Sequence, residues 1–159
     1  MLRRERAELS AALERELPRA FVHPDFVSVD IIEHGFSGEE NGAANNGQRK
    51  WTVVDWTGAG VAYRVVSLGF LLSVAGARGK MVLVDEVMKG YGEFVKLEDC
   101  ELEVLAKAVY VRFFTLDCWE VAMERKEPKI TVERLKSFRD IGDNVAKHVR
   151  NKLQSTVVS

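Results

Sequence analysis

The sequence is poor in cysteine and has no long apolar run, and each shortage excludes a class of protein. Its 159 residues contain two cysteines, Cys100 and Cys118, which do not form a Cys-x-x-Cys pair. This spacing indicates neither a zinc site nor a disulfide framework, so we interpret both as buried free thiols. The longest apolar stretch, near residues 65–77, is interrupted by serine and glycine and is too short to span a bilayer.

Positive and negative residues are nearly equal in number, so the sequence has little net charge. The formal net charge is −1, although 30% of the residues are charged. This balance favours a soluble surface and argues against binding nucleic acid through bulk charge. No signal peptide is visible, because the N-terminal MLRRERAELS is charged and no apolar run follows it. We therefore expect a cytoplasmic protein with no nucleic-acid or membrane partner.

The acids that are present concentrate in one block of the chain. Residues 21–60 hold six acids against two bases, whereas residues 120–152 hold nine bases against six acids. The acidic block suits a metal ion or a cationic ligand. The basic block alternates in sign, which is typical of a solvated helix face.

The chain length predicts a single domain, residues 1–159. Apolar residues recur at helical spacing, or fill nearly a whole segment, in five places, which predicts helices over 2–16, 62–76, 81–91, 99–126 and 131–152. Two extended segments, 29–33 and 51–55, predict a β-hairpin with a long exposed loop, 35–50, that is rich in glycine and asparagine. The predicted fold class is α+β, mainly α. The large residues that we expect in the core include the tryptophans, Trp51, Trp56 and Trp119.

Three acids stand at the ends of the strands predicted for this region. Asp25 and Asp30 belong to FVHPDFVSVDIIE, residues 21–33, and Asp55 belongs to WTVVDWTGAG, residues 51–60. Carboxylate oxygens suit magnesium, which neutralises phosphate oxygens, and an acceptor hydroxyl needs a carboxylate within hydrogen-bond reach. The pattern indicates a metal–phosphate catalytic centre. Solvated loop charges are the alternative, and this alternative carries most weight for Asp30.

Together the two segments resemble the aminoglycoside phosphotransferase and choline kinase-like family, whose signature runs H-G-D-x-x-x-x-N and then hydrophobic-D-[WF]. The resemblance covers roughly residues 15–150. It implies the C-terminal lobe of a protein kinase-like fold, with a short β-hairpin that bears the acids and a helical bundle. It also implies Mg²⁺-dependent transfer of the γ-phosphate of ATP or GTP to a small-molecule hydroxyl. In that scheme Asp25 is the catalytic base, Asp30 and Asp55 are metal ligands, and His23 is a structural residue of the loop.

The chain departs from the family pattern at three positions and in one larger feature. Pro24 replaces the usual glycine, Asp30 replaces asparagine, and Ser67 stands where the family usually has an aspartate. No Gly-x-Gly-x-x-Gly loop is present, so the residues that would bind the nucleotide are unknown. The sequence thus corresponds to the C-terminal lobe without the nucleotide-binding lobe, either as a fragment or as a natural truncation.

Two functions are compatible with these observations. The first is a phosphotransferase-like lobe with weak or no kinase activity alone, because nothing in the sequence holds the nucleotide. The second is a non-catalytic binding or interaction module, a degenerate kinase lobe. Apolar residues near Val22, Phe26, Trp51 and Trp56 would favour association, either as a homodimer or with a partner chain. The sequence does not identify a substrate.

Overall fold

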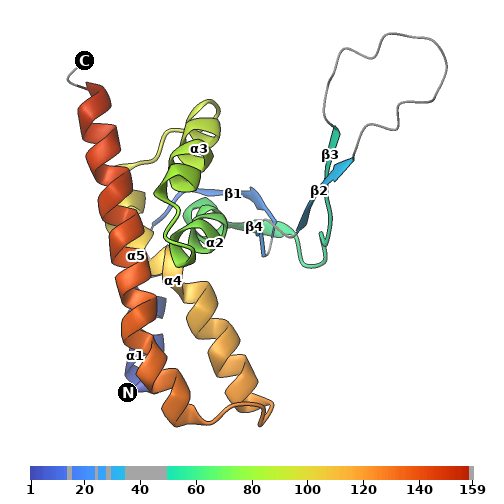
Figure 1. The fold of residues 1–159 in the computed structure, drawn as a ribbon, viewed down its shortest axis with the longest axis vertical. Coiled ribbons are helices and arrows are strands. Elements are labelled where there is room, and N and C mark those ends of the chain that lie inside the picture. Colours follow the sequence, from blue (N-terminus) through green and yellow to red (C-terminus); the bar gives the residue numbers. More distant parts are fainter. Residues whose placement is uncertain (14–15, 24, 28–29, 35–49, 158–159) are drawn as a thin grey trace, which may run out of the picture.

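The structure is a computed structural model that describes the chain apart from residues 14–15, 24, 28–29, 35–49 and 158–159. Within that part the fold is α+β and mainly helical, as predicted, with five helices and two small antiparallel sheets (Figure 1). The helices are α1 (Leu2–Leu13), α2 (Arg64–Ala77), α3 (Met81–Gly92), α4 (Asp99–Ala122) and α5 (Pro128–Val157). The strands are β1 (Arg19–Val22), β2 (Ile31–His34), β3 (Lys50–Val53) and β4 (Gly60–Tyr63). Most of the predicted loop 35–50 lies outside the described residues.

Helix α2 forms the centre of the core. Its residues Val65 and Leu72 are completely buried, and it packs against both α4 and α5. The contact with α4 is close because Gly69 lies at it: a Cβ atom on Gly69 would lie 2.4 Å from the carbonyl of Ala108. Glycine is therefore required there by the approach of the two backbones.

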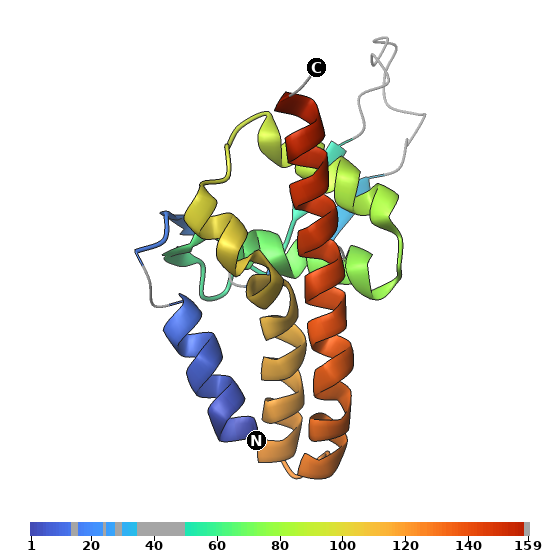
Figure 2. The same cartoon turned by 90° about the vertical axis from the view of Figure 1, so that its left-hand side faces the viewer.

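Helices α4 and α5 run antiparallel and side by side (Figures 1 and 2). The predicted boundary between them was wrong, because α4 ends at Ala122 rather than near residue 126 and α5 begins at Pro128. Glu124 has a left-handed backbone with φ of 57°, a conformation that does not continue a helix. Proline is favoured in the first turn, where its missing N–H group is not needed.

Helix α1 is attached to this pair through a buried acid. Glu5 is only 2% exposed, and it accepts hydrogen bonds from the Tyr110 hydroxyl over 2.7 Å and from the Arg139 guanidinium. A buried carboxylate is tolerated when charged and polar donors surround it in this way. Burial and the neighbouring Glu5 raise the pKa of Tyr110, so the hydroxyl keeps the proton that it donates.

The two small sheets connect the helices to a projecting hairpin. Strands β2 and β3 pair antiparallel, with Ile32 opposite Thr52, so the predicted hairpin is confirmed. Strand β1 pairs with β4, which places Phe21 opposite Val61. The sequence did not predict β4, because its last two residues were assigned to the helix predicted over 62–76. Figure 1 shows β2 and β3 standing away from the helical body.

Several residues expected in the core lie nearer the surface. Trp51, Trp56 and Trp119 are 55%, 50% and 50% exposed, so the prediction that they are core residues was wrong. Trp51 belongs to the projecting hairpin, while Trp119 lies beneath the guanidinium of Arg125 at the far end of α4. Both cysteines are free but only partly buried. None of the described helices is long and apolar enough to cross a membrane.

Candidate functional site

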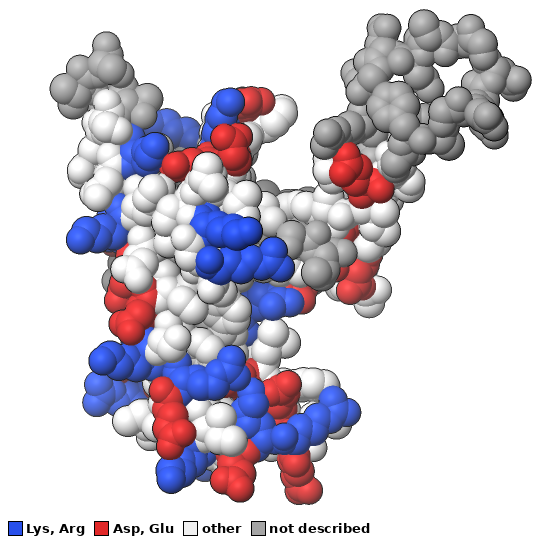
Figure 3. Space-filling view, viewed as in Figure 1, with Lys and Arg blue, Asp and Glu red and all other residues white. Residues whose placement is uncertain are grey.

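The two acidic segments of the sequence lie next to each other in the fold. Asp30 directly precedes β2 and Asp55 follows β3, so the β2–β3 pairing brings their backbones together. The N–H of Val54 donates to the carbonyl oxygen of Asp30 over 2.9 Å, which extends that pairing by one step. Figure 3 shows acidic side chains gathered at this hairpin, in agreement with the acidic block of the sequence.

His23 joins the two segments and is a structural residue, as the sequence predicts. Its ring is 5% exposed, and Nε2 lies 2.7 Å from the carbonyl oxygen of Val54. Because that oxygen can only accept, Nε2 carries the proton, and Nδ1 accepts from the backbone N–H of Asp25 over 3.3 Å. The Ser67 hydroxyl donates to the carbonyl oxygen of His23 over 3.2 Å, which ties this loop to α2.

Asp25, the candidate catalytic base, is engaged by an arginine from a distant part of the chain. Arg112 of α4 donates from Nε to Oδ1 over 2.5 Å and from Nη2 to Oδ2 over 2.9 Å. Such a bidentate pair uses both carboxylate oxygens and fixes their direction. Asp25 therefore points toward α4. Sequence reasoning missed Arg112, because nothing in a helical pattern distinguishes it from other charged residues of that helix.

The two candidate metal ligands have local roles in the backbone. One carboxylate oxygen of Asp30 lies 3.4 Å from the N–H of Val27, which closes a short turn. Asp55 is exposed and has a positive φ of 62°, in the left-handed region where aspartate is more frequent than most residues. This conformation turns the chain sharply out of β3.

A magnesium ion at these positions would be held by carboxylate oxygens. Among the described residues, no group of three or more His, Cys, Asp or Glu side chains is placed to hold a metal ion. Both oxygens of Asp25, the candidate base, are bonded to Arg112. The magnesium ion that the resemblance implies therefore stays a prediction that depends on Asp30 and Asp55.

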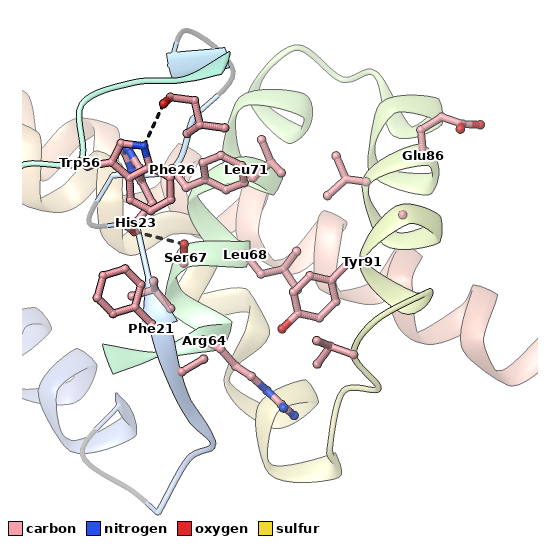
Figure 4. A pocket seen from close by; sticks show the side chains of 16 residues that line it. Phe21, His23, Phe26, Trp56, Arg64, Ser67, Leu68, Leu71, Glu86 and Tyr91 are labelled. Atoms are coloured by element: carbon pink, nitrogen blue, oxygen red, sulfur yellow. Dashed lines mark hydrogen bonds between the residues drawn. The ribbon is translucent and has the colours of Figure 1, made fainter. Parts of the chain in front are cut away.

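A cavity of about 590 Å³ lies beside this region, between β1, α2, α3 and the two acidic segments. One wall is aromatic and includes Phe21, Phe26 and Trp56, while the facing wall includes Leu68 and Leu71 from α2 (Figure 4). The Trp56 ring is held by a hydrogen bond from Nε1 to the carbonyl oxygen of Val53 over 2.8 Å. The sequence analysis expected Trp56 in the core, and it did not predict that α2 and α3 form part of these walls.

The basic group in the cavity wall is neutralised by a buried acid. Arg64 donates from Nε and Nη2 to the two carboxylate oxygens of Glu101, over 2.9 and 2.6 Å. Glu101 is completely buried, and it also accepts from the backbone N–H of Glu98 to form the capping box of α4. The hydrogen bond to Glu101 raises the pKa of Arg64, so the guanidinium stays charged.

Comparison with known proteins identified no relative of this chain. No protein-family model matches the chain, and comparisons with curated proteins and with solved structures gave no match. The kinase-like resemblance therefore stays a prediction from the sequence.

Proposed function

We propose that the chain is a small-molecule-binding lobe, organised like the C-terminal lobe of a kinase, and that the cavity between β1, α2 and α3 is its binding site. The observation that supports this most strongly is the cavity itself. Its volume of about 590 Å³ falls among those of cavities that take small ligands. Its walls are also anchored in the core, since Leu68 is buried and α2 is the central helix.

The cavity and the candidate base face different directions, which favours binding over catalysis. His23 and Phe26 line the cavity, whereas Asp25, which lies between them in the sequence, bonds to Arg112 of α4. The sixteen side chains that line the cavity do not include Asp25, Asp30 or Asp55. A molecule in the cavity would therefore meet none of the three carboxylates that phosphoryl transfer requires.

A fragment screen read by NMR tests this proposal. Fragments that bind should shift the methyl signals of Leu68, Leu71 and Val87 together, because these residues share the cavity. A Val87→Trp variant should lose the shifts, since an indole on α3 fills the cavity. A Val82→Trp variant is the matched control, because Val82 lies on the same helix and is 64% exposed. The proposal is wrong if fragments from a chemically mixed library shift signals only outside these walls.

A phosphotransferase-like lobe is the second candidate, and one observation favours it. His23 bonds to the carbonyl oxygen of Val54 and to the backbone N–H of Asp25, so the two acidic segments are held next to each other. The implied reaction transfers the γ-phosphate of ATP or GTP to a hydroxyl of a small molecule. We expect the chain alone to have little or none of this activity, because no nucleotide-binding residues are identified.

Calorimetry with ATP or GTP, each with Mg²⁺, separates the two candidates. No heat of binding in either titration would support the binding lobe. Heat of binding, together with phosphotransfer that is lost in Asp25→Asn and kept in Asp143→Asn, would establish the second candidate. Asp143 is a suitable control because it is an exposed aspartate of α5, far along the chain from the acidic segments.

We also propose that the lobe associates, either as a homodimer or with a partner chain, through the apolar residues of its two sheets. Phe21 and Val61 are directly opposite each other and are 69% and 67% exposed. Exposed apolar patches of this kind favour association. Light scattering after size-exclusion chromatography should show a dimer that Val61→Ser weakens, and a monomer at high concentration would contradict the homodimer.

A further inference from the structure

The walls of the cavity indicate which kind of molecule it accepts. Phe21, Phe26 and Trp56 present aromatic surface on one side, and aliphatic residues of α2 and α3 face them together with Tyr91 of α3. Figure 4 shows the three rings grouped on the strand side and the Leu68 and Leu71 side chains opposite. A flat apolar molecule fits between such walls, because its two faces would contact aromatic and aliphatic groups at the same time.

Two of the polar side chains in the walls, His23 and Ser67, already have protein partners, whereas the buried hydroxyl of Tyr91 has none among the described residues and leaves one neutral hydrogen-bonding position for a ligand. His23 uses both ring nitrogens, for the carbonyl of Val54 and the N–H of Asp25. The Ser67 hydroxyl donates to the backbone of the same histidine. These groups hold the cavity in shape, so a ligand that required them would first have to break those hydrogen bonds.

The charged groups in the walls do not favour an ionic ligand either. The guanidinium of Arg64 is matched by the buried carboxylate of Glu101 and also donates to the carbonyl of Lys96. Glu86 is exposed, and in Figure 4 its carboxylate points away from the other labelled side chains. A charge brought into this cavity would lose its hydration and would meet no unpaired opposite charge directed into the cavity from the described residues, which is strongly unfavourable.

We propose that the ligand of this cavity is an uncharged, flat, largely apolar small molecule. The inference depends on the proposed binding function and narrows it. The proposed ligand also differs from the substrates that the resemblance implies, because aminoglycosides and choline are cations. Such a ligand would cover the half-exposed ring of Trp56 and the exposed ring of Phe21 at the mouth of the cavity.

Titration with prodan, an uncharged aromatic ketone whose emission reports the polarity around it, tests the proposal. With the wild-type chain we expect saturable binding, a shift of the emission to shorter wavelength, and shifts in the methyl signals of Leu68 and Leu71. Val87→Trp should weaken the affinity by about tenfold or more, because the indole occupies the volume that the ligand needs. Val82→Trp should bind prodan as the wild type does.

A second variant tests the same cavity in case Val87→Trp does not fold. Phe21 is 69% exposed, so Phe21→Ala should fold normally. We expect it to weaken prodan binding by about three- to tenfold, since one aromatic contact is lost. Circular dichroism of every variant checks that the helices are retained.

Three outcomes would overturn the proposal in distinguishable ways. If kanamycin or choline shifts the Leu68 and Leu71 signals and prodan does not, the cavity binds small molecules but not uncharged apolar ones. If prodan binds Val87→Trp as well as the wild type, its site lies elsewhere. If neither prodan nor any fragment of a mixed library shifts the cavity signals, the proposed binding function fails as well.

Discussion

Replacing Glu101 by glutamine should destabilise the chain strongly, because it removes one charge of a buried ion pair. Both oxygens of Glu101 accept from Arg64, and its side chain has no exposed surface. Glutamine has nearly the same shape, but its NH2 group can only donate, so the change removes the charge and one of the two acceptor atoms. It leaves the guanidinium of Arg64 with only the exposed carboxylate of Glu98, 3.6 Å away, as a counter-ion among the described residues.

The expected loss in the free energy of unfolding follows from burial. Breaking a buried pair costs about 3–5 kcal/mol, because the remaining charge is uncompensated. Arg64 keeps 21% of its side-chain surface exposed and also donates to the carbonyl of Lys96. We therefore expect a loss near the lower limit, about 3 kcal/mol.

Urea unfolding followed by circular dichroism measures this loss as a shift of the midpoint at constant slope. Glu127→Gln, at an exposed position, is the matched control and should change little. Arg64→Met combined with Glu101→Gln should recover part of the stability, because no charge is then left unpaired. A loss of less than about 1 kcal/mol for Glu101→Gln alone would refute the reasoning, since exposed pairs contribute only that much.

Three further predictions concern single positions. Gly69→Ala should destabilise by about 1–3 kcal/mol because its Cβ would meet the backbone of α4, whereas Gly90→Ala, where nothing lies within 4 Å, should be neutral or stabilising in the same urea assay. Asp55→Gly should keep the thermal midpoint because φ is 62° there, while Asp55→Val should lower stability by about 1 kcal/mol or more; equal midpoints for the two would contradict this. The hydrogen bond from His148 lowers the pKa of Asp85 in the folded chain, so this contact stabilises at neutral pH and is lost as the pH falls below about 4. Asp85→Asn should accordingly destabilise at pH 7 more than at pH 3 in parallel urea titrations, and an equal loss at both pH values would count against the contact.

The helices were largely predictable because their apolar residues recur at helical spacing. The errors lie where a local conformation ends an element without a sequence signal. Glu124 adopts φ of 57° and ends α4 early, although glutamate is a good helix former. β4 was missed because its last residues were assigned to the helix that follows, and because it pairs with a strand about forty positions earlier.

For the candidate site, the sequence predicted the pairing of the strands but not the contacts of the side chains. Two short extended segments and the glycine- and asparagine-rich loop between them correctly indicated the hairpin next to Asp30 and Asp55. The sequence could not reveal that Arg112 engages Asp25, a contact across 87 positions of the sequence. Likewise, Leu71 and Val87 have the pattern of core residues, but they line a cavity instead of filling it.

The tryptophans show why residue type is a weak guide to burial in a small lobe. Trp51 belongs to a hairpin that no described helix covers, and Trp56 borders the mouth of the cavity. Large apolar residues are buried only if another element packs over them. Their exposure supports a ligand at Trp56 and a protein partner at the sheets as separate proposals.

A crystal structure of the chain with prodan would test the central claim most directly. We predict that the naphthalene lies between Trp56 and Leu71, with the Arg64–Glu101 pair and the hydrogen bonds of His23 unchanged. Ligand density only on exposed surfaces, such as those around Trp51 or Trp119, with the cavity left without ligand, would contradict the claim that this cavity is the binding site.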